Sequence, residues 1–305
     1  MFLRARRRQL LFSLGAAAVA GLLLASTWVA VSPASAEPTA SRDAVTRQSS
    51  GTAGITLTSG AQDTQWRQTK PTVVLVHGAW ADSSSWDGVI DRLRQAGYPV
   101  VAAADPLEGL DQDSAAVASL LRSIKGPIIL VGHSYGGAVI TNAAAGNPNV
   151  KALVYIAAFA PDKGESVGSL IARPVAHPIA ALPLVSYPVV NANGTTDTDF
   201  IIDPTQYQQV FAGDVNPTLA ADMSATQRPA ASGAVTEDTT QAAWQTIPSW
   251  YLVAKQDHAI APDLERYMAA RAHGHTVESD GSHSIMVSHP GTVAQLIETA
   301  AWSTR

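Results

Sequence analysis

A serine between two glycines, Gly-x-Ser-x-Gly at residues 132–136, is the part of this sequence best suited to chemistry. An apolar run that predicts a strand, 127–131, comes before it, and an alanine-rich run that predicts a helix, 138–145, follows it. A strand, a sharp turn and a helix place the hydroxyl of Ser134 at an exposed tip, where it can act as a nucleophile. The flanking glycines relieve crowding around its strained backbone, and the helix N-terminus favours negative charge beside it.

A serine hydroxyl needs a base to take its proton, and that base needs a carboxylate to hold its tautomer. Behind a turn of this kind, the acid and then the histidine follow the serine along the chain. His283 lies just beyond a predicted strand at 275–278 and is the predicted base. The other late histidines suit capping, structural or pocket-lining roles, and they are His289, His273, His275 and His177.

The predicted acid is Asp257, which directly follows the predicted strand 250–254. A solvated loop aspartate is the alternative interpretation of this residue. Three rivals fit less well: Asp263 is typical of a first helical turn, Asp280 is too close in sequence to His283, and Asp105 precedes the serine.

The oxyanion that forms when a serine attacks a carbonyl needs two preorganised amide donors. We expect one from the backbone N–H of Tyr135, the residue after the serine, and the other from Ala79, in the loop that follows the first predicted strand. The residues expected around the substrate pocket are Gly78, Trp80 and His133. For Trp80, as for Trp86, a place in the buried core is the alternative, and for His133 it is a packing role.

The first 36 residues carry the pattern of an export signal. A basic start with Arg4, Arg6, Arg7 and Arg8 precedes an uncharged stretch at 10–31 and a small-x-small cleavage site at 34–36. Either the Sec or the twin-arginine route is compatible with it, and an uncleaved membrane anchor is the alternative. We therefore expect a protein that is secreted or extracytoplasmic. Residues 37–70 are predicted to be a flexible lead-in, with one strand at 54–58.

Charge and composition narrow the classes of partner. Lys and Arg total 20 and Asp and Glu total 25, so removal of the four leading arginines leaves 16 basic against 25 acidic residues, a net charge of −9. Such a surface does not suit nucleic acid or anionic lipid, and we expect no membrane contact once the signal is cleaved. The chain has no cysteine, and Gly-x-x-x-x-Gly-Lys, His-Glu-x-x-His and Gly-x-Gly-x-x-Gly motifs are absent. No cofactor and no metal are therefore expected.

Predicted strands and helices alternate from residue 71 onward. The predicted strands are 72–76, 99–103, 128–131, 152–157, 250–254 and 275–278, and the predicted helices are 86–95, 114–124, 138–145, 262–272 and 290–302. Continuous apolar strands joined by helices predict an α/β fold with a mostly parallel sheet that has helices on both faces.

This alternation stops between residues 161 and 246, a segment that is rich in proline and shows no convincing strand. We predict an inserted, mainly helical lid at 161–246 between two parts of the core, 71–160 and 247–305. The alternative is an insertion on the surface that has no role in function.

Several stretches together resemble the α/β-hydrolase superfamily. They are 73–86, 132–137, 159–165, 248–262 and 281–290, and the resemblance covers about residues 71–302. Small bacterial esterases related to plant methylesterases and hydroxynitrile lyases are the most similar branch. The resemblance implies that Ser134, Asp257 and His283 form a triad and that Ala79 and Tyr135 form the oxyanion hole.

Two departures bear on the reaction. Hydroxynitrile lyases of this branch have a threonine after the first-loop histidine and a lysine after the catalytic histidine, where this chain has Gly78 and Ser284. The resemblance therefore implies a serine esterase that acts through an acyl-enzyme. The N-terminal pattern predicts export, and the Ala, Pro, Leu and Val content of the predicted lid suggests a small or medium apolar acyl or aryl ester. A cofactor-free lyase and a ligand-binding protein with little turnover remain alternatives, and the oligomeric state is not indicated.

Overall fold

The computed structural model describes residues 70–304. The predicted export signal, nearly all of the predicted lead-in and the predicted strand at 54–58 lie outside these residues. Within the described part of the chain, no helix is long and apolar enough to cross a membrane.

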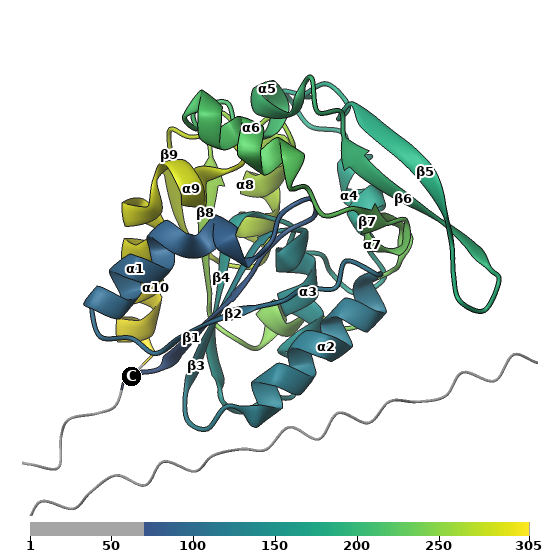
Figure 1. Cartoon of the computed structure of the whole chain (residues 1–305). Helices are drawn as coiled ribbons and strands as arrows, with labels where there is room; N and C mark the ends of the chain where they lie inside the picture. The colour runs from purple at the N-terminus through teal and green to yellow at the C-terminus, as the bar shows by residue number, and fades with distance from the viewer. Residues whose placement is uncertain (1–69, 305) are drawn as a thin grey trace, which may run out of the picture. The chain divides into compact units, whose positions relative to one another are not determined.

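Six parallel strands form the central sheet, in the order β2-β1-β3-β4-β8-β9 (Figure 1). The strands are β1 (Thr72–Val76), β2 (Val100–Ala103), β3 (Ile128–Ser134), β4 (Val150–Ala158), β8 (Ser249–Ala254) and β9 (His275–Ser279). Each coincides with a predicted strand to within a few residues. Because parallel strands end at the same edge, the loops after β1, β3, β8 and β9 meet at the carboxyl edge of the sheet.

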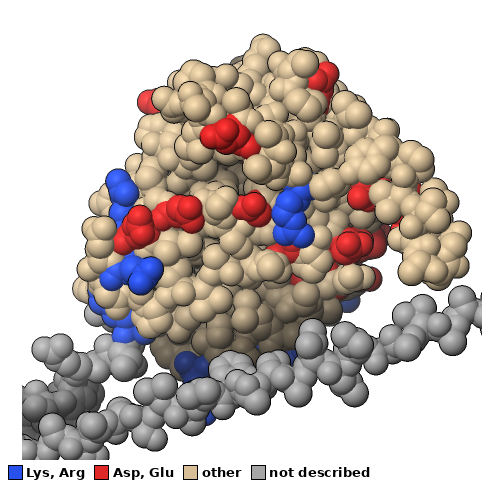
Figure 2. Space-filling view, in the orientation of Figure 1, with Lys and Arg blue, Asp and Glu red and all other residues tan. Residues whose placement is uncertain are grey.

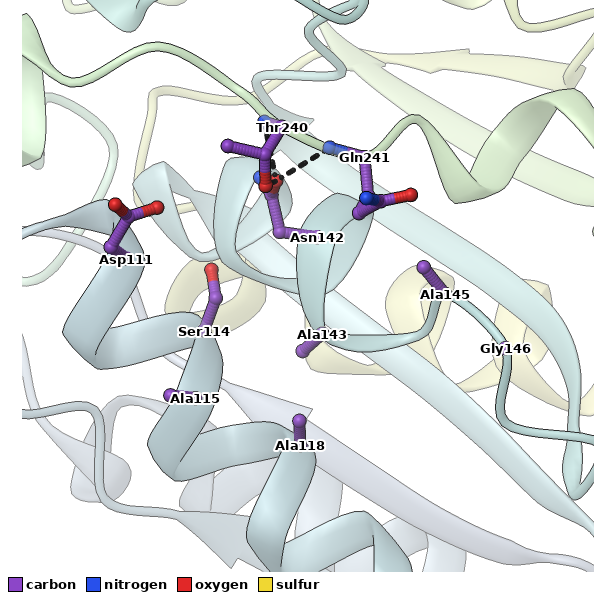
Figure 3. A pocket seen from close by; sticks show the side chains of 10 residues that line it. All are labelled: Asp111, Ser114, Ala115, Ala118, Asn142, Ala143, Ala145, Gly146, Thr240 and Gln241. Atoms are coloured by element: carbon purple, nitrogen blue, oxygen red, sulfur yellow. Dashed lines mark hydrogen bonds between the residues drawn. The ribbon is translucent and has the colours of Figure 1, made fainter.

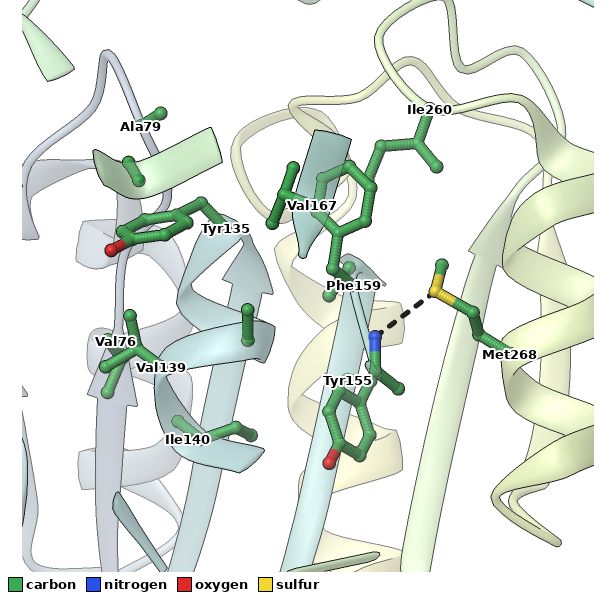
Figure 4. Close-up of a cluster of buried hydrophobic side chains, with 14 of the residues drawn as sticks. Val76, Ala79, Tyr135, Val139, Ile140, Tyr155, Phe159, Val167, Ile260 and Met268 are labelled. Carbon is green, nitrogen blue, oxygen red and sulfur yellow. Dashed lines mark hydrogen bonds between the residues drawn. The ribbon is translucent and has the colours of Figure 1, made fainter. Parts of the chain in front are cut away.

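Helices cover both faces of the sheet, as predicted. Side chains alternate along β1, so Val74 and Val76 join one buried cluster while Val73 and Leu75 join the other. Figure 4 shows part of the first cluster, where Val76, Val139 and Met268 pack around the sheet. Each fully buried aliphatic side chain of this kind contributes roughly 1.5–3 kcal/mol. The first face carries α2 (Leu110–Ser123), α3 (Tyr135–Ala143) and α8 (Pro262–Arg271), and the second carries η1 (Ser83–Trp86), α1 (Asp87–Gln95), α9 (Ile285–Ser288) and α10 (Pro290–Ser303).

The segment between β4 and β8, residues 161–246 and called the insertion below, differs from the prediction. It contains four short helices and η2, but also a β-hairpin that pairs with a third short strand. The expectation that it holds no strand is therefore wrong. Its elements are α4 (Val167–Ile171), β5 (Leu184–Val190), β6 (Thr196–Ile202), α5 (Tyr207–Phe211), α6 (Pro217–Ala225), β7 (Ala230–Ala231), α7 (Gly233–Thr236) and η2 (Ala243–Gln245).

The hairpin extends away from the central sheet (Figure 1), and the charged side chains visible in Figure 2 lie mostly over other parts of that face. Pro188 lies within β5, which is an edge strand of the small sheet and therefore tolerates a residue without an N–H donor. The connection carries Asn193-Gly194, with Gly194 at φ +84°, which is a common hairpin turn signal. This turn and the apolar residues of β5 could have predicted the hairpin.

Candidate active site

Ser134 occupies the junction of β3 and α3 with a φ of 52° and a ψ of −124°. A serine rarely adopts a positive φ, and such strain persists only where the surroundings enforce it. Close packing does so here: a Cβ atom on Gly136 would lie 2.5 Å from the carbonyl oxygen of His77, and one on Gly132 would lie 2.5 Å from the carbonyl oxygen of Gly136. The two glycines of the motif therefore let β1 and α3 approach the turn, which holds the serine at its tip.

His283 and Asp257 are brought together at the same edge of the sheet. Nδ1 of His283, in the loop after β9, lies 2.5 Å from Oδ2 of Asp257, in the loop after β8. Both side chains are buried. The other carboxylate oxygen, Oδ1, accepts the N–H groups of Ala259 at 2.6 Å and Ile260 at 2.8 Å. This arrangement places the imidazole proton on Nδ1 and leaves Nε2 able to accept one.

Nε2 of His283 is buried and has no hydrogen-bond partner among the described residues. Ser134 is next in sequence to His133, whose ring centroid lies 4.7 Å from that of His283. The described side chains form no hydrogen bond between Ser134 and His283. Catalytic hydrogen bonds in unliganded enzymes are often long and shorten when substrate binds, so a buried Nε2 without a partner suits a general base.

The loop after β1 packs directly on the serine. A Cβ atom on Gly78 would lie 2.7 Å from Cβ of Ser134, so only glycine fits at this position. Nδ1 of His77 bonds the carbonyl of Gly78 at 3.0 Å, and its Nε2 accepts the N–H of Asp105 at 3.1 Å. Burial lowers the pKa of His77 below its ordinary value of 6.5, which keeps the ring neutral and able to make both bonds. His77 thereby holds the loop that carries Ala79.

Tyr135 begins α3, so its backbone N–H is one of the free donors at the helix N-terminus. Its phenol points away from the serine and donates to Oδ2 of Asp113 at 2.7 Å. Burial raises the pKa of the Tyr135 phenol well above its ordinary value, so the group stays neutral. Sequence reasoning did not find Asp113, which directly precedes the predicted helix 114–124 but lies within the observed helix α2.

A cavity of about 680 Å³ opens onto Ser134, Ala79 and Tyr135. The loop between α4 and β5 forms much of its wall, and Arg173 is the one charged side chain among the residues that line it. Since pockets that hold small molecules span roughly 300–1,000 Å³, the cavity can enclose a medium-sized ligand. Its lining is otherwise almost entirely apolar.

Of the three residues predicted around the pocket, Trp80 lines this cavity, whereas Gly78 and His133 do not. Gly78 has no side chain to present and lies against the serine. His133 points into the interior, where Nε2 donates to the carbonyl of His283 at 2.9 Å, and burial lowers its pKa well below the ordinary value. Trp86 is fully buried in the core on the other face of the sheet.

A model of a protein family described as "Alpha/beta hydrolase family" matches residues 73–296, which is more than half of the chain. The chain belongs to the alpha/beta hydrolase family. The resemblance predicted from the sequence is thereby confirmed.

Named relatives of this alpha/beta hydrolase are themselves hydrolases. The alpha/beta hydrolase nvfD of Aspergillus novofumigatus is 25% identical over 256 residues, which cover 76% of this chain and 97% of that protein. The carbendazim hydrolyzing esterase of Nocardioides sp. is 33% identical over 121 residues, which cover 35% of this chain and 50% of that protein. The crystal structure of polyneuridine aldehyde esterase has a TM-score of 0.65 at 17% identity, covers 75% of this chain and 98% of that one, and shows the common fold. The named relatives support an enzyme of the carboxylic ester hydrolase class.

The remaining late histidines of this hydrolase lie elsewhere. His177 is exposed in the insertion, and its Nδ1 lies 2.9 Å from Oδ2 of Asp263 at the start of α8. His289 lies 3.4 Å from Asp214, and the ring of His275 stacks on Trp250. Each of these three histidines is therefore paired or stacked with a side chain outside the candidate triad. Among residues 70–304, no group of three or more His, Asp or Glu side chains could hold a metal ion.

A second cavity of about 470 Å³ lies between α2, α3 and the end of the insertion (Figure 3). The side chain of Asn142 makes the main hydrogen bonds at this cavity. Its Oδ1 accepts the N–H groups of Thr240 and Gln241, each at 3.0 Å. None of the candidate catalytic side chains lines it. These bonds fix the returning end of the insertion to α3.

Proposed function

We propose that this alpha/beta hydrolase is a serine esterase that uses Ser134, His283 and Asp257 as its catalytic triad. The observation that carries the proposal is the buried His283, whose Nδ1 is bonded to Asp257 while its Nε2 is unpartnered, on a ring 4.7 Å from that of His133, which directly precedes a serine with strained backbone. A base with its proton fixed on the far nitrogen, next to a nucleophile, is the arrangement that acyl transfer requires.

In this mechanism Nε2 of His283 takes the proton of Ser134 as the Oγ atom attacks the ester carbonyl. The negative charge on the carbonyl oxygen is held by the N–H groups of Ala79 and Tyr135, and Asp257 stabilises the imidazolium. His283 then gives its proton to the leaving alcohol, and an acyl-enzyme remains on Ser134. The same histidine activates a water molecule, which releases the acid and restores the serine.

The cavity supports a proposal for the substrate class. Its lining offers shape and apolar contact but few hydrogen-bonding side chains, because the phenol of Tyr135 is already bonded to Asp113. An ester with a small or medium apolar acyl or aryl group suits such a lining. We further propose that residues 1–36 are removed during export and that the enzyme works outside the cytoplasm, which N-terminal sequencing of secreted protein would test.

The decisive experiment compares wild type with Ser134→Ala on p-nitrophenyl esters of short and medium chain length. Removal of the nucleophile should lower kcat/KM by about a thousandfold or more. Ser114→Ala is the matched control, since Ser114 is also buried but lies on α2 and lines the second cavity. Its activity should equal that of wild type.

Two outcomes would contradict the proposal. Ester turnover that survives in Ser134→Ala would exclude the acyl-enzyme mechanism. The second outcome would come from a mandelonitrile cleavage assay. Cyanide release by wild type without turnover of any ester would assign the site to a lyase. In the esterase, a phosphonate ester should label Ser134 covalently, as read by mass spectrometry, and should not label Ser134→Ala.

A further inference from the structure

Glu265 is a fully buried acid that the proposed mechanism does not use. It lies on α8, and none of its side chain is exposed. The described residues provide no cation for it, because the neighbouring Arg266 points outward and pairs with Asp263 and Glu278 instead. An ionised carboxylate in such a place would be strongly destabilising unless it were paired.

The surroundings of Glu265 are the machinery behind the histidine. Its Oε2 accepts the N–H of Ala254, the last residue of β8, at 3.3 Å, while its Oε1 has no partner among the described residues. Asp257 bonds the same residue, because its N–H donates to the carbonyl of Ala254 at 3.2 Å, and the charge of its carboxyl group acts on the pKa of Glu265. From β8 the phenol of Tyr251 also faces it, and this hydroxyl donates to the carbonyl of Ala158 and stays neutral. The positive charge of Arg266 acts to lower the pKa of Glu265.

Two neighbouring carboxyl groups in a buried space cannot both be ionised without a large cost, so one of them keeps a proton. The hydrogen bonds show which one. Asp257 accepts two short backbone N–H bonds and the N–H of His283, whereas Glu265 accepts one long bond. The negative charge therefore belongs on Asp257. Burial first, and then the charge of Asp257, raise the pKa of Glu265 well above its ordinary value.

We propose that Glu265 is a positioning residue, whose protonated carboxyl group donates a hydrogen bond to Asp257 and holds that carboxylate toward His283. The proposal rests on the proposed triad, because Asp257 matters to catalysis only as the partner of the histidine. Glu265 touches neither the substrate nor the reacting atoms. Its effect is to supply a further donor to a buried carboxylate and to limit the rotation of that carboxylate.

The test uses two substitutions of Glu265 that differ in one property. Glu265→Gln keeps the size, the neutrality and a donor, while Glu265→Leu keeps the approximate size but has no donor. The matched control is Glu278→Gln, which removes the exposed partner of Arg266 near the same helix. For each variant we would measure the pH dependence of kcat/KM, the value of kcat, and the midpoint of the His283 imidazole titration by NMR.

We expect Glu265→Gln to leave the acid limb of the profile in place and to keep nearly the wild-type kcat. In Glu265→Leu the loss of a donor to a charged group should lower kcat by about tenfold with KM unchanged. The acid limb should also move to higher pH, since a less solvated Asp257 charge favours the imidazolium. Glu278→Gln should behave as wild type.

Two results would contradict the proposal. If Glu265 were ionised, Glu265→Gln would remove a negative charge near His283 and would lower the acid limb by about one pH unit or more. Equal kcat values for the Gln and Leu variants would also overturn the proposal, since a structural role alone would not distinguish them. If Glu265→Leu fails to fold, the acid limb of the Glu265→Gln profile still shows whether Glu265 is ionised. If wild type cleaves no ester, the proposed function fails, while the NMR titration still tests Glu265.

Discussion

The carboxyl edge of the sheet and the insertion both border the cavity at Ser134, but they are held in very different ways. At the edge, the exposed fractions of Ser134, Asp257 and His283 are 4%, 1% and 0%. Each of them lies at the end of a strand or in the loop that follows a strand. In the insertion the hairpin leaves large apolar side chains in solvent, with Leu184 45% and Val190 73% exposed. One region is packed on all sides, whereas the other is buried where it meets the rest of the molecule, as at Tyr207 and Phe211, and exposed along the hairpin.

This difference in packing corresponds to two different requirements, positioning of the reacting atoms and recognition of the substrate. The reacting atoms must hold positions to a fraction of an ångström, which close-packed strand ends and glycines can enforce. The shape of the substrate is set by a wall of loops and short elements, which tolerate change because few backbone groups depend on them. We therefore expect substitutions at the edge to act on every substrate, and those in the insertion to act on some substrates only.

The largest effect should come from Gly136→Ala at the edge. Its Cβ atom would lie 2.5 Å from the carbonyl of His77 and 2.7 Å from that of Val76, so the backbone around the serine must move. We expect a loss of several kcal/mol in the free energy of unfolding and a fall in kcat/KM of about a hundredfold or more. Urea denaturation and p-nitrophenyl ester assays would measure the two quantities.

The matched control in the insertion is Gly194→Ala, at the hairpin turn. Its φ of +84° makes alanine unfavourable by roughly 1 kcal/mol, but no atom lies within 4 Å of the new Cβ. Its kcat/KM should stay at the wild-type value for every ester. If the two alanine variants lost activity equally, the contrast between the edge and the insertion would be refuted.

A smaller and selective effect is expected from Leu182→Trp, in the loop that forms the cavity wall. The larger ring would occupy part of the space for the acyl chain. We predict that kcat/KM for an octanoate ester falls by about tenfold, while that for an acetate ester changes less than about twofold, since each buried methylene is worth about 0.8 kcal/mol. Val190→Trp, on the exposed hairpin, should change neither value. A uniform loss across chain lengths would show that the loop also positions the reacting atoms.

The same contrast explains what the sequence could predict. The six core strands were predictable because strands buried on both faces are continuous apolar runs, such as 128–131. Asp257 and His283 could be chosen because the functional residues of this kind of sheet follow the strands in a set order, and the structure brings their side chains into contact.

Other features could not be predicted because they depend on packing between distant segments. Glu265 resembles any acid in the first turn of a helix, and only burial against Asp257 distinguishes it. The hairpin differs from these cases: Asn193-Gly194 and the apolar residues of β5 could have predicted it, but Pro188 and the other prolines of the segment argued against a strand. That His133 turns inward was likewise decided by its contact with the carbonyl of His283.

The last predicted effect concerns the charge states of acids in the two regions. Asp105, which follows β2, is fully buried, and burial together with the neighbouring Asp113 raises its pKa well above the ordinary 3.8. In the insertion, hydrogen bonds from Thr205 to the partly exposed Asp203 lower the pKa of that carboxyl group. Replacement of each by asparagine should therefore shift stability in opposite directions as the pH changes.

In the folded protein Asp105 keeps its proton at pH values where the unfolded chain loses it, so folding takes up a proton and wild type becomes less stable as pH rises above about 4. Asparagine does not titrate. The stability of Asp105→Asn relative to wild type should thus increase from pH 4 toward pH 7, by at most about 1.4 kcal/mol per unit. Asp203→Asn should show a small loss at pH 7 that disappears on acidification. Urea denaturation at several pH values measures both, and a difference for Asp105→Asn that does not change with pH would mean that Asp105 is ionised in the folded enzyme.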